Sequence, residues 1–232
     1  MVKQEVNLAC FGITFTSATG HEEADIAPNG DGRARTLMQH AAFNGHAEIL
    51  AFLIEHGASI DHQSAPGWPP LLLAAEEGRY KAAKVLLQNG ASTIPSRSHP
   101  RPISLACKCG HTDIFELLLQ HGAAIQDEQD VKDDEDGSLS GDDGAETPLI
   151  TVAASQGNMP LVKLLLRYGA NANEADEGGF TPLLCAAIEG HCDVARLLLD
   201  NGANAATDNN EGKTPLNAAI YQGNINMAEL LL

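Results

Sequence analysis

Aromatic residues are scarce in this sequence, and their scarcity limits how its interior can be built. Only 4% of the 232 residues are aromatic although 44% are hydrophobic, which indicates a core of small aliphatic side chains. Nor does any segment approach the roughly 18 apolar residues of a membrane-spanning helix. The N-terminus has no apolar run of signal-peptide length. We therefore expect no membrane insertion.

Basic residues are scarce as well, and the acidic excess is concentrated in one segment. The chain has 14 lysines and arginines against 31 aspartates and glutamates, a formal net charge of −17. Residues 127–146 contain ten acids and one lysine, and so hold nine of these negative charges. Binding to nucleic-acid phosphates or to anionic membranes needs clustered lysine and arginine, so neither is expected. A basic patch on a partner protein would be attracted instead.

The cysteine content does not indicate disulfide bonds. The five cysteines are an odd number in a chain long enough to bury a core without cross-links: Cys10, Cys107, Cys109, Cys185 and Cys192. Reduced thiols of this kind are typical of reducing compartments. We therefore expect an intracellular protein, either cytoplasmic or nuclear.

What the sequence does contain is a regular series of glycines. One set precedes an alanine each time, at intervals of 33, 32, 47 and 33 residues: Gly57, Gly90, Gly122, Gly169 and Gly202. A second set lies twelve residues before each of these, at Gly45, Gly78, Gly110, Gly157 and Gly190, and Gly223 begins a sixth unit. Because both sets keep one register, an internal repeat of about 33 residues is indicated.

Each unit is predicted to consist of a helix, a turn, a second helix and a loop. A threonine that caps free amides, followed by a proline that needs no N–H, marks the start of the first helix. Such pairs occur at Thr147-Pro148, Thr181-Pro182 and Thr214-Pro215, while Thr36 lacks the proline and Pro70 and Pro102 lack the threonine. Pairs of small residues then let helices approach closely. The glycine before each alanine supplies the left-handed turn that ends the second helix.

The units resemble the ankyrin repeat, whose pattern of Thr-Pro-Leu, a small pair, Gly-His, a leucine-rich run and Gly-Ala is matched best by residues 181–204, TPLLCAAIEGHCDVARLLLDNGAN. The resemblance implies an all-α fold, an ankyrin-repeat solenoid of stacked helix-turn-helix units with projecting β-hairpin-like loops. It covers residues 30–232, with repeats at about 32–64, 65–96, 97–126, 142–175 and 176–208 and a partial repeat at 209–232. Residues 127–146 are an acidic loop insertion.

Two departures from the family pattern carry predictions. The histidine expected after Thr-Pro-Leu is replaced in every unit, by Gln39, Leu72, Ser104, Ile150, Leu184 and Asn217. The hydrogen bonds that this histidine would make between loop and helix are therefore lost or made by other side chains. We expect the loops to be more flexible than in an idealised array. Pro148 also lies nine residues before Gly157 where other units have eight. This spacing predicts either a bulge in that helix or a start shifted by one residue.

Both ends of the chain are irregular. Residues 1–29 lack a leucine run and form either an irregular segment or a degenerate first repeat, because Leu8, Ala9 and Gly12 keep the 33-residue register. The last residues, 230–232, lie inside the second helix of the sixth unit. A solenoid needs a polar cap over its last apolar face, so we expect the array to continue in a longer protein.

No cluster of residues predicts catalysis or cofactor binding. Cys107, Cys109 and His111 suggest a metal site at first sight, but zinc sites use four ligands and a wider cysteine spacing. Repeat packing already explains Cys107 and His111. Nucleophile-elbow, phosphate-loop and dinucleotide motifs do not occur in the sequence. We therefore expect no enzyme activity, no metal and no cofactor.

The acidic insert has three interpretations. A solvated, self-repelling, flexible loop is the simplest. A calcium loop of the EF-hand type would have Gly137 at its sixth position and Lys132 as its first ligand, and lysine cannot coordinate a cation. The third interpretation is a tether for a basic partner, tuned by phosphorylation of Ser138 or Ser140, since insertions in repeat arrays often lie on the binding face.

The family resemblance also predicts where a partner binds. Partners of ankyrin-like stacks lie in the concave groove, against the two residues between each small pair and the turn glycine and against the residue before each threonine position. The contact residues expected on this basis are Arg35, Phe43, Asn44, Trp68, Glu76, Glu77, Lys108, Phe180, Ile188, Glu189, Lys213, Tyr221 and Gln222. Four of them are aromatic, and exposed aromatic side chains often dominate binding energy. The alternative for each ring is that it folds back on a neighbouring loop.

These patterns together predict a scaffold or adaptor that binds another protein through the groove and is monomeric in isolation. The alternative is a regulatory or targeting region of a larger multidomain enzyme or channel.

Overall fold

The computed structural model describes residues 7–8, 13–14, 35–61, 68–94, 99–126 and 147–232. Within these ranges the chain forms twelve helices in six consecutive pairs, which are called units one to six below. The first helices are α1 (Leu37–Asn44), α3 (Pro70–Glu76), α5 (Pro102–Lys108), α7 (Leu149–Ser155), α9 (Pro182–Glu189) and α11 (Pro215–Tyr221). The second helices are α2 (Ala47–Glu55), α4 (Tyr80–Gln88), α6 (Thr112–Gln120), α8 (Met159–Arg167), α10 (Cys192–Asp200) and α12 (Ile225–Leu231). The predicted all-α solenoid is confirmed.

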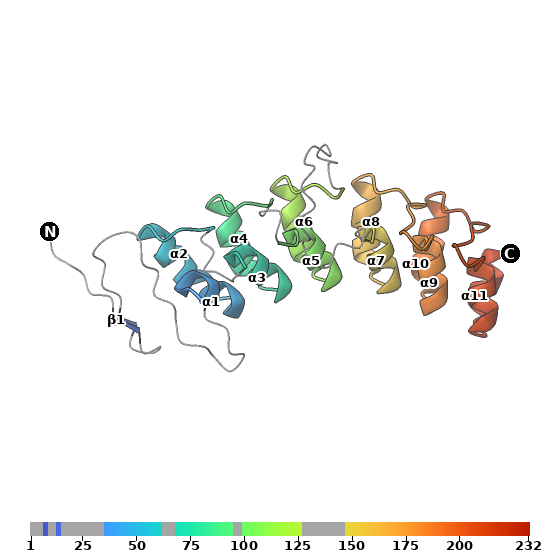
Figure 1. The fold of residues 1–232 in the computed structure, drawn as a ribbon, viewed down its shortest axis with the longest axis horizontal. Helices are drawn as coiled ribbons and strands as arrows, with labels where there is room; N and C mark the ends of the chain where they lie inside the picture. Colours follow the sequence, from blue (N-terminus) through green and yellow to red (C-terminus); the bar gives the residue numbers. More distant parts are fainter. Residues whose placement is uncertain (1–6, 9–12, 15–34, 62–67, 95–98, 127–146) are drawn as a thin grey trace, which may run out of the picture.

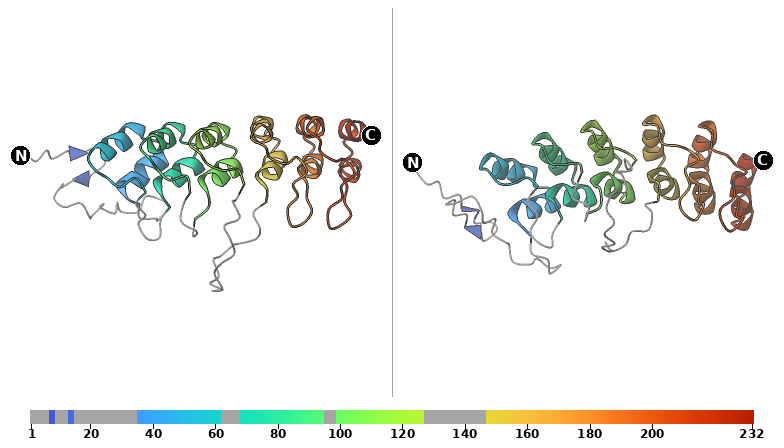
Figure 2. Two further views of the ribbon diagram at one scale, coloured as in Figure 1. Left: turned by 90° about the horizontal axis from the view of Figure 1, so that it is seen from above. Right: turned by 45° about the horizontal axis from the view of Figure 1, so that its top comes forward.

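The helix pairs stack side by side into an arched array (Figure 1). Each first helix packs against the first helices of its neighbours, and the second helices do the same along their own row. In Figure 1 the first helices follow the inner, concave side of the arch and the second helices follow the outer side. The loops that join units four to five and five to six project from one edge of the stack, in the same direction (Figure 2).

The N-terminal segment is described only in part, and the acidic insert lies outside the described residues. Strand β1 (Asn7–Leu8) pairs antiparallel with strand β2 (Ile13–Thr14). The remaining residues before Arg35 and the insert at 127–146 lie outside the described residues. The degenerate-repeat, calcium, tether and phosphorylation hypotheses for these segments therefore stay predictions.

Threonine and proline set the starts of the first helices. Thr181 and Thr214 are N-caps whose hydroxyls accept hydrogen bonds from amides three residues on, and proline follows each of them in the first helical position. Thr36 caps α1 without a proline, in a capping box with Gln39. Helices α3 and α5 begin with proline but have no side-chain cap. Each of these starts was predicted from the sequence.

Helix α7 is the exception, because it starts one residue later. It begins at Leu149, with Pro148 as its N-cap residue and no side-chain cap. The predicted start at Thr147-Pro148 is therefore wrong, and the shifted start is the one of the two alternatives that the structure contains. Leu149 lies eight residues before Gly157, the spacing that Pro182 has from Gly190. The turn glycine thus sets the register, and the extra residue is left in the loop.

Each of the first five second helices ends at a glycine with a left-handed backbone. After α6, Gly122 has a φ of 85° and donates to the carbonyl of Leu119, while Ala123 donates to the carbonyl of Leu118. These two bonds form a Schellman motif, and the same pair of bonds ends α2, α4, α8 and α10. The Gly-Ala series therefore marks helix ends, as the sequence predicted.

Small and aliphatic side chains build the interior. The small pairs lie almost fully buried between helices, at Ala41, Ala42, Ala74, Ala75, Ala106, Cys107, Ala186 and Ala187. Leucines of the second helices, among them Leu50, Leu86 and Leu118, are fully buried beside them. Because Ala and Cys occupy little volume, adjacent first helices approach closely, and this approach places the ends of the first helices in one continuous row.

Candidate partner-binding face

The predicted groove residues lie mostly at the C-terminal ends of the first helices and in the loops just before them. The structure places them at three depths. Asn44, Lys108, Glu189, Lys213, Tyr221 and Gln222 are exposed; Phe43, Trp68, Glu76, Glu77, Phe180 and Ile188 are half-buried; Arg35 is buried. Six of the thirteen predicted contact residues are therefore exposed to solvent.

Side chains of the following unit bind the backbone at these positions. Arg79 Nε donates to the carbonyl of Phe43 at 2.9 Å. Gln156 Nε2 donates to the carbonyl of Lys108 at 2.7 Å and to that of Cys107 at 3.2 Å. Each bond crosses a junction between units and ends at the last turn of a first helix. A hydrogen bond of this kind contributes roughly 0.5–1.5 kcal/mol to stability.

Two histidines make the same connection at two further junctions. His111 Nε2 lies 3.0 Å from the carbonyl oxygen of Glu76, and His191 Nε2 lies 3.1 Å from that of Ser155. Because a carbonyl can only accept, Nε2 must carry a proton in both rings. At four consecutive junctions a side chain of the next unit thus binds a backbone carbonyl in the preceding unit. The carbonyl belongs each time to the first of the two residues between the small pair and the turn glycine.

The connecting rings also pack on the turn glycines. A Cβ placed on Gly78 would lie 2.6 Å from Cε1 of His111, and a Cβ on Gly157 would lie 2.6 Å from Nδ1 of His191. Both glycines have a left-handed backbone, with φ values of 70° and 67°. These two turns therefore need glycine for the backbone conformation and also because of the ring beside each of them.

Sequence reasoning missed the connecting role of these side chains. It explained His111 by repeat packing alone, its register placed Gln156 only among the two residues before a turn glycine, and it gave Arg79 no role. The signal that could have found them is positional, because Arg79, His111 and His191 each follow a turn glycine directly and each can donate a hydrogen bond.

In two units another side chain makes the hydrogen bonds between loop and first helix that the resemblance assigns to the histidine after Thr-Pro-Leu. In unit one, Gln39 Nε2 donates to the carbonyl of Trp68 at 2.9 Å, and its Oε1 accepts from the Thr36 amide. In unit four, the hydroxyl of Thr151 donates to the carbonyl of Glu174 at 3.3 Å. A side chain of a first helix therefore still holds a loop at both places.

The aromatic side chains among the predicted contact residues differ in whether their rings pack against other parts of the chain. The guanidinium of Arg35 lies 3.9 Å from the ring centre of Phe43, a cation–π contact within unit one. The ring of Phe180 packs against the core and over Gly178, whose added Cβ would lie 2.9 Å from it. Tyr221 is 91% exposed. Two rings are thus engaged inside the chain, and Tyr221 is open.

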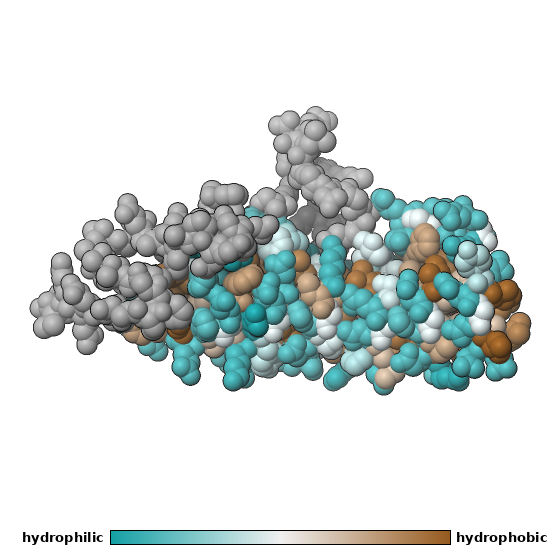
Figure 3. Space-filling view, turned by 90° about the horizontal axis from the view of Figure 1, so that it is seen from below, coloured by the Kyte–Doolittle hydropathy of each residue, from teal (hydrophilic) through white to brown (hydrophobic). Residues whose placement is uncertain are grey.

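The concave side is mostly polar except near its C-terminal end. Figure 3 shows this side, with hydrophilic residues over most of the described surface and hydrophobic residues gathered where units five and six lie. The large exposed hydrophobic residues of unit six are Ile220, Tyr221, Ile225 and Leu232. Ile220 and Tyr221 belong to first helix α11, whereas Ile225 lies in second helix α12 and Leu232 follows it.

The cysteines are placed for packing rather than for reaction. Cys107 is buried and its thiol donates to the carbonyl of Leu149 across the junction at 3.4 Å. Burial raises the pKa of Cys107 to about 12, against a smaller opposing effect of Lys108. Burial and the charges of Asp176 and Glu189 raise the pKa of Cys185 to about 11. Because the thiolate is the reactive form, both thiols are inert at neutral pH.

Neither a metal site nor a membrane span is found in the part of the chain that the structure describes. No group of three or more histidine, cysteine, aspartate or glutamate side chains is arranged there to hold a metal ion. None of the helices in the described ranges is long and apolar enough to cross a bilayer.

The stacked helix pairs, their Gly-Ala turns and the row of connected first helices define an ankyrin-type array, and comparison with known families agrees. The family model of ankyrin repeats in three copies matches residues 13–97, 103–208 and 150–232. The chain belongs to the ankyrin repeat family. Members of this family generally act as protein-interaction modules, and the fold is typically non-enzymatic.

Curated relatives match over one part of their length. Ankyrin repeat protein nuc-2 of Neurospora crassa is 34% identical over 143 residues, which are 61% of this chain and 12% of that protein. Glycerophosphocholine phosphodiesterase GDE1 of Candida albicans is 36% identical over 91 residues, 38% of this chain and 8% of that protein. A transient receptor potential cation channel subfamily A member 1 homolog of Caenorhabditis elegans is 27% identical, with 63% and 14% covered. The chain spans less than a sixth of each.

Solved structures match over most of the chain. The ankyrin repeat domain of human ASB11 has a TM-score of 0.69 at 26% identity, covering 85% of this chain and 82% of that one. An ankyrin repeat domain from Acinetobacter baumannii has the same TM-score and identity, covering 84% and 95%. These matches confirm the fold.

Proposed function

We propose that this chain is a scaffold or adaptor, monomeric in isolation, that binds another protein along its concave face. One observation carries the proposal: in units one to four the next unit holds the end of the first helix in place, yet side chains there, among them Asn44 and Lys108, are exposed. Because the backbone beneath these side chains is already fixed, little ordering entropy is lost when a partner binds.

The contact residues divide by chemistry. Tyr221 and half-buried Ile188 offer apolar area in units five and six. Glu76, Glu77 and Glu189 give the row an acidic character that favours a partner with a basic patch. Lys108, Lys213 and the amides Asn44 and Gln222 add positions for hydrogen bonds. Arg35 and Phe43 contribute as one stacked pair.

A second candidate function is a regulatory or targeting region within a larger protein. It is supported by the partial matches to a phosphodiesterase and to a cation-channel homolog, of which the chain covers 8% and 14%. Such a region would still act by binding, so both functions share the concave face. In either case we propose an intracellular setting, cytoplasmic or nuclear, because four described cysteines are free thiols.

The test is capture of partners from cell extract by wild-type protein and two variants. Trp68→Ala combined with Tyr221→Ala removes two aromatic groove residues and should reduce the captured partner at least about tenfold. Tyr168→Ala is the matched control, because this exposed tyrosine follows outer helix α8. Both variants should keep the wild-type helical circular dichroism. Equal capture by all three folded proteins would contradict groove binding.

A further inference from the structure

Hydrogen bonds join the loops that follow successive second helices along most of the array. Asp61, in the loop after unit one, accepts from the Ser92 amide in the loop after unit two at 3.2 Å. The Arg101 guanidinium, at the end of that second loop, donates to the carbonyl of Ala124 in the loop after unit three. The loops of the first three units are therefore linked in a series.

The loops after units four and five are linked as well. Asn173 Oδ1 accepts from the Asn204 amide at 2.7 Å, and Asn173 Nδ2 donates to the carbonyl of Gly202 at 2.9 Å. Asn210 Nδ2 donates to the carbonyl of Glu177 at 2.8 Å. These bonds hold the two loops side by side.

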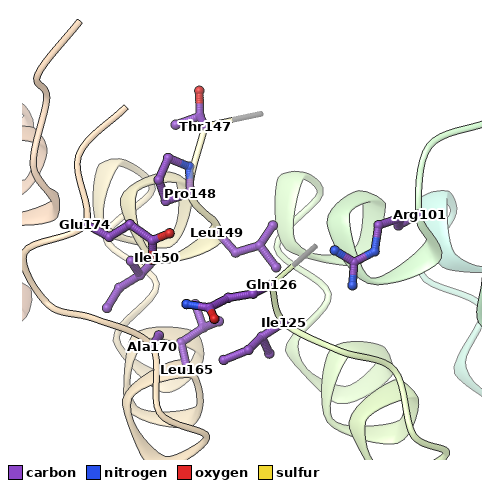
Figure 4. Close-up of a pocket in the computed structure, with 10 residues that line it drawn as sticks. All are labelled: Arg101, Ile125, Gln126, Thr147, Pro148, Leu149, Ile150, Leu165, Ala170 and Glu174. Carbon is purple, nitrogen blue, oxygen red and sulfur yellow. The ribbon is translucent and has the colours of Figure 1, made fainter. Parts of the chain in front are cut away.

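The loops after units three and four differ, because no hydrogen bond in the described part of the chain connects residues 122–126 with residues 169–180. A cavity of about 450 Å³ lies between them, with Ile125 and Gln126 on the unit-three side and Glu174 on the unit-four side (Figure 4). Both rows of helices also pack least extensively at this junction, where α5 meets α7 and α6 meets α8. Among the described residues, loop bonding and helix packing are therefore both weakest here.

The other end of the same junction is closed. Gln156 Nε2 donates to the carbonyl of Lys108 at 2.7 Å, and Asn158 Nδ2 donates to that of Gly110 at 3.3 Å. These bonds lie at the turn after α5, whereas Arg101, just before the start of α5, lines the cavity. Units three and four are thus joined at the turn and separated at the loops, which is the geometry of a hinge.

We propose that the array consists of two blocks, units one to three and units four to six, which bend relative to each other about the turn after α5. In a repeat array each unit contacts only its neighbours, so a weak junction also divides folding into two cooperative parts. Bending changes the curvature of the concave side between Lys108 and Ser155, and a partner that spans both blocks selects one curvature. The hinge exists whether or not the concave face binds a partner.

Urea denaturation followed by tryptophan fluorescence tests the division into blocks. Trp68 is the single tryptophan of the chain and lies before α3 in unit two. Leu118→Ala removes a fully buried leucine of unit three and should lower the urea midpoint of the Trp68 signal by at least about 1 M. Leu198→Ala removes the equivalent leucine of unit five and should lower that midpoint by less than about 0.3 M. Ile114→Val and Val194→Ala, also at fully buried positions, replace these variants if either protein fails to fold.

A second probe makes the two leucine variants equally distant. Trp68→Phe combined with Tyr168→Trp places the tryptophan after α8 in unit four, which adjoins both unit three and unit five. In this background Leu198→Ala should lower the midpoint by at least about 1 M and Leu118→Ala by less than about 0.3 M. Equal shifts from the two sides would overturn the division at this junction.

Residual dipolar couplings of backbone amides test the bending itself. The couplings of α1–α6 and those of α7–α12 should fit two alignment tensors of different magnitude, because the blocks move relative to each other. As an internal control, α1–α4 and α5–α6 should share one tensor. A single tensor that fits all twelve helices would overturn the hinge.

The missing loop bond is tested by restoring it. Gln126 lies four residues after a helix-ending glycine, as do Asp61 and Asn173, but its side chain is longer by one methylene group. Gln126→Asn should bond to the loop after unit four and reduce the difference between the two tensors. Gln88→Asn makes the same change at the exposed end of α4 and should leave that difference as it is. An unchanged difference in Gln126→Asn would overturn the assignment of the hinge to the missing loop bond.

Discussion

The two kinds of turn in this array look alike in sequence and differ in what surrounds them. Glycine with a left-handed backbone ends both helices of a unit, as at Gly157 after α7 and Gly122 after α6. A Cβ on Gly122 would meet nothing within 4 Å, whereas a Cβ on Gly157 would lie 2.6 Å from the ring of His191. The turn after the second helix, here called the outer turn, thus needs glycine only for its left-handed backbone. The turn after the first helix is called the inner turn. The turn at Gly157 also needs glycine because the ring of the next unit packs against it, and this packing lies beside the candidate groove.

Replacing these two glycines with alanine should give the largest difference. Gly157→Ala combines left-handed strain with overpacking against the His191 ring, and should lower the free energy of unfolding by about 3 kcal/mol. Gly122→Ala has the strain alone and should lower it by about 1 kcal/mol. Urea denaturation followed by circular dichroism measures both. Equal losses would show that the ring has no part in the inner turn.

Removal of a connecting ring should have an intermediate effect. His191→Ala leaves the Ser155 carbonyl without its donor and removes packing over Gly157, so stability should fall by about 1–2 kcal/mol. His121→Ala changes an exposed histidine at the end of α6 and should shift stability by less than about 0.5 kcal/mol. A larger loss of stability in His121→Ala than in His191→Ala would contradict the distinction between the turns after the first and the second helices.

The smallest effect concerns two cysteines at the inner end of α5. Burial raises the pKa of Cys107 to about 12, so the neutral thiol is favoured in the folded protein. Its contribution to stability is complete below the ordinary value of 9.0 and is lost as the pH rises from there toward about 12. At pH 8, alkylation should modify exposed Cys109 at least about tenfold faster than Cys107. Mass spectrometry after timed iodoacetamide treatment checks this, and equal rates would mean that Cys107 is not buried between units.

The sequence predicted the scaffold well because its signals are local. Gly-Ala turns, Thr-Pro starts and small pairs depend on backbone sterics and capping within a few residues, and Thr181 and Gly122 behave as those rules require. For α7 the spacing of Pro148 from Gly157 left two alternatives, a bulge or a shifted start, and the structure has the shifted start because packing of Gly157 sets the register.

The candidate site was less predictable, since its connections join residues from different units. Nothing local to Gln156 indicates that its amide reaches the carbonyl of Lys108, 48 residues away. The burial of Arg35 under Phe43 likewise depends on packing within the folded first unit. Register identifies which residues lie in the row, and three-dimensional packing decides which of them remain exposed.

The most direct test of the central claim, that the next unit's side chains hold the inner turns, is a double-mutant cycle of Gly157→Ala and His191→Ala. In the His191→Ala background the ring is gone, so Gly157→Ala should lose only the strain term of about 1 kcal/mol, as Gly122→Ala does. The account predicts a coupling energy of about 1–2 kcal/mol between the two sites in urea denaturation. Strictly additive losses would contradict it.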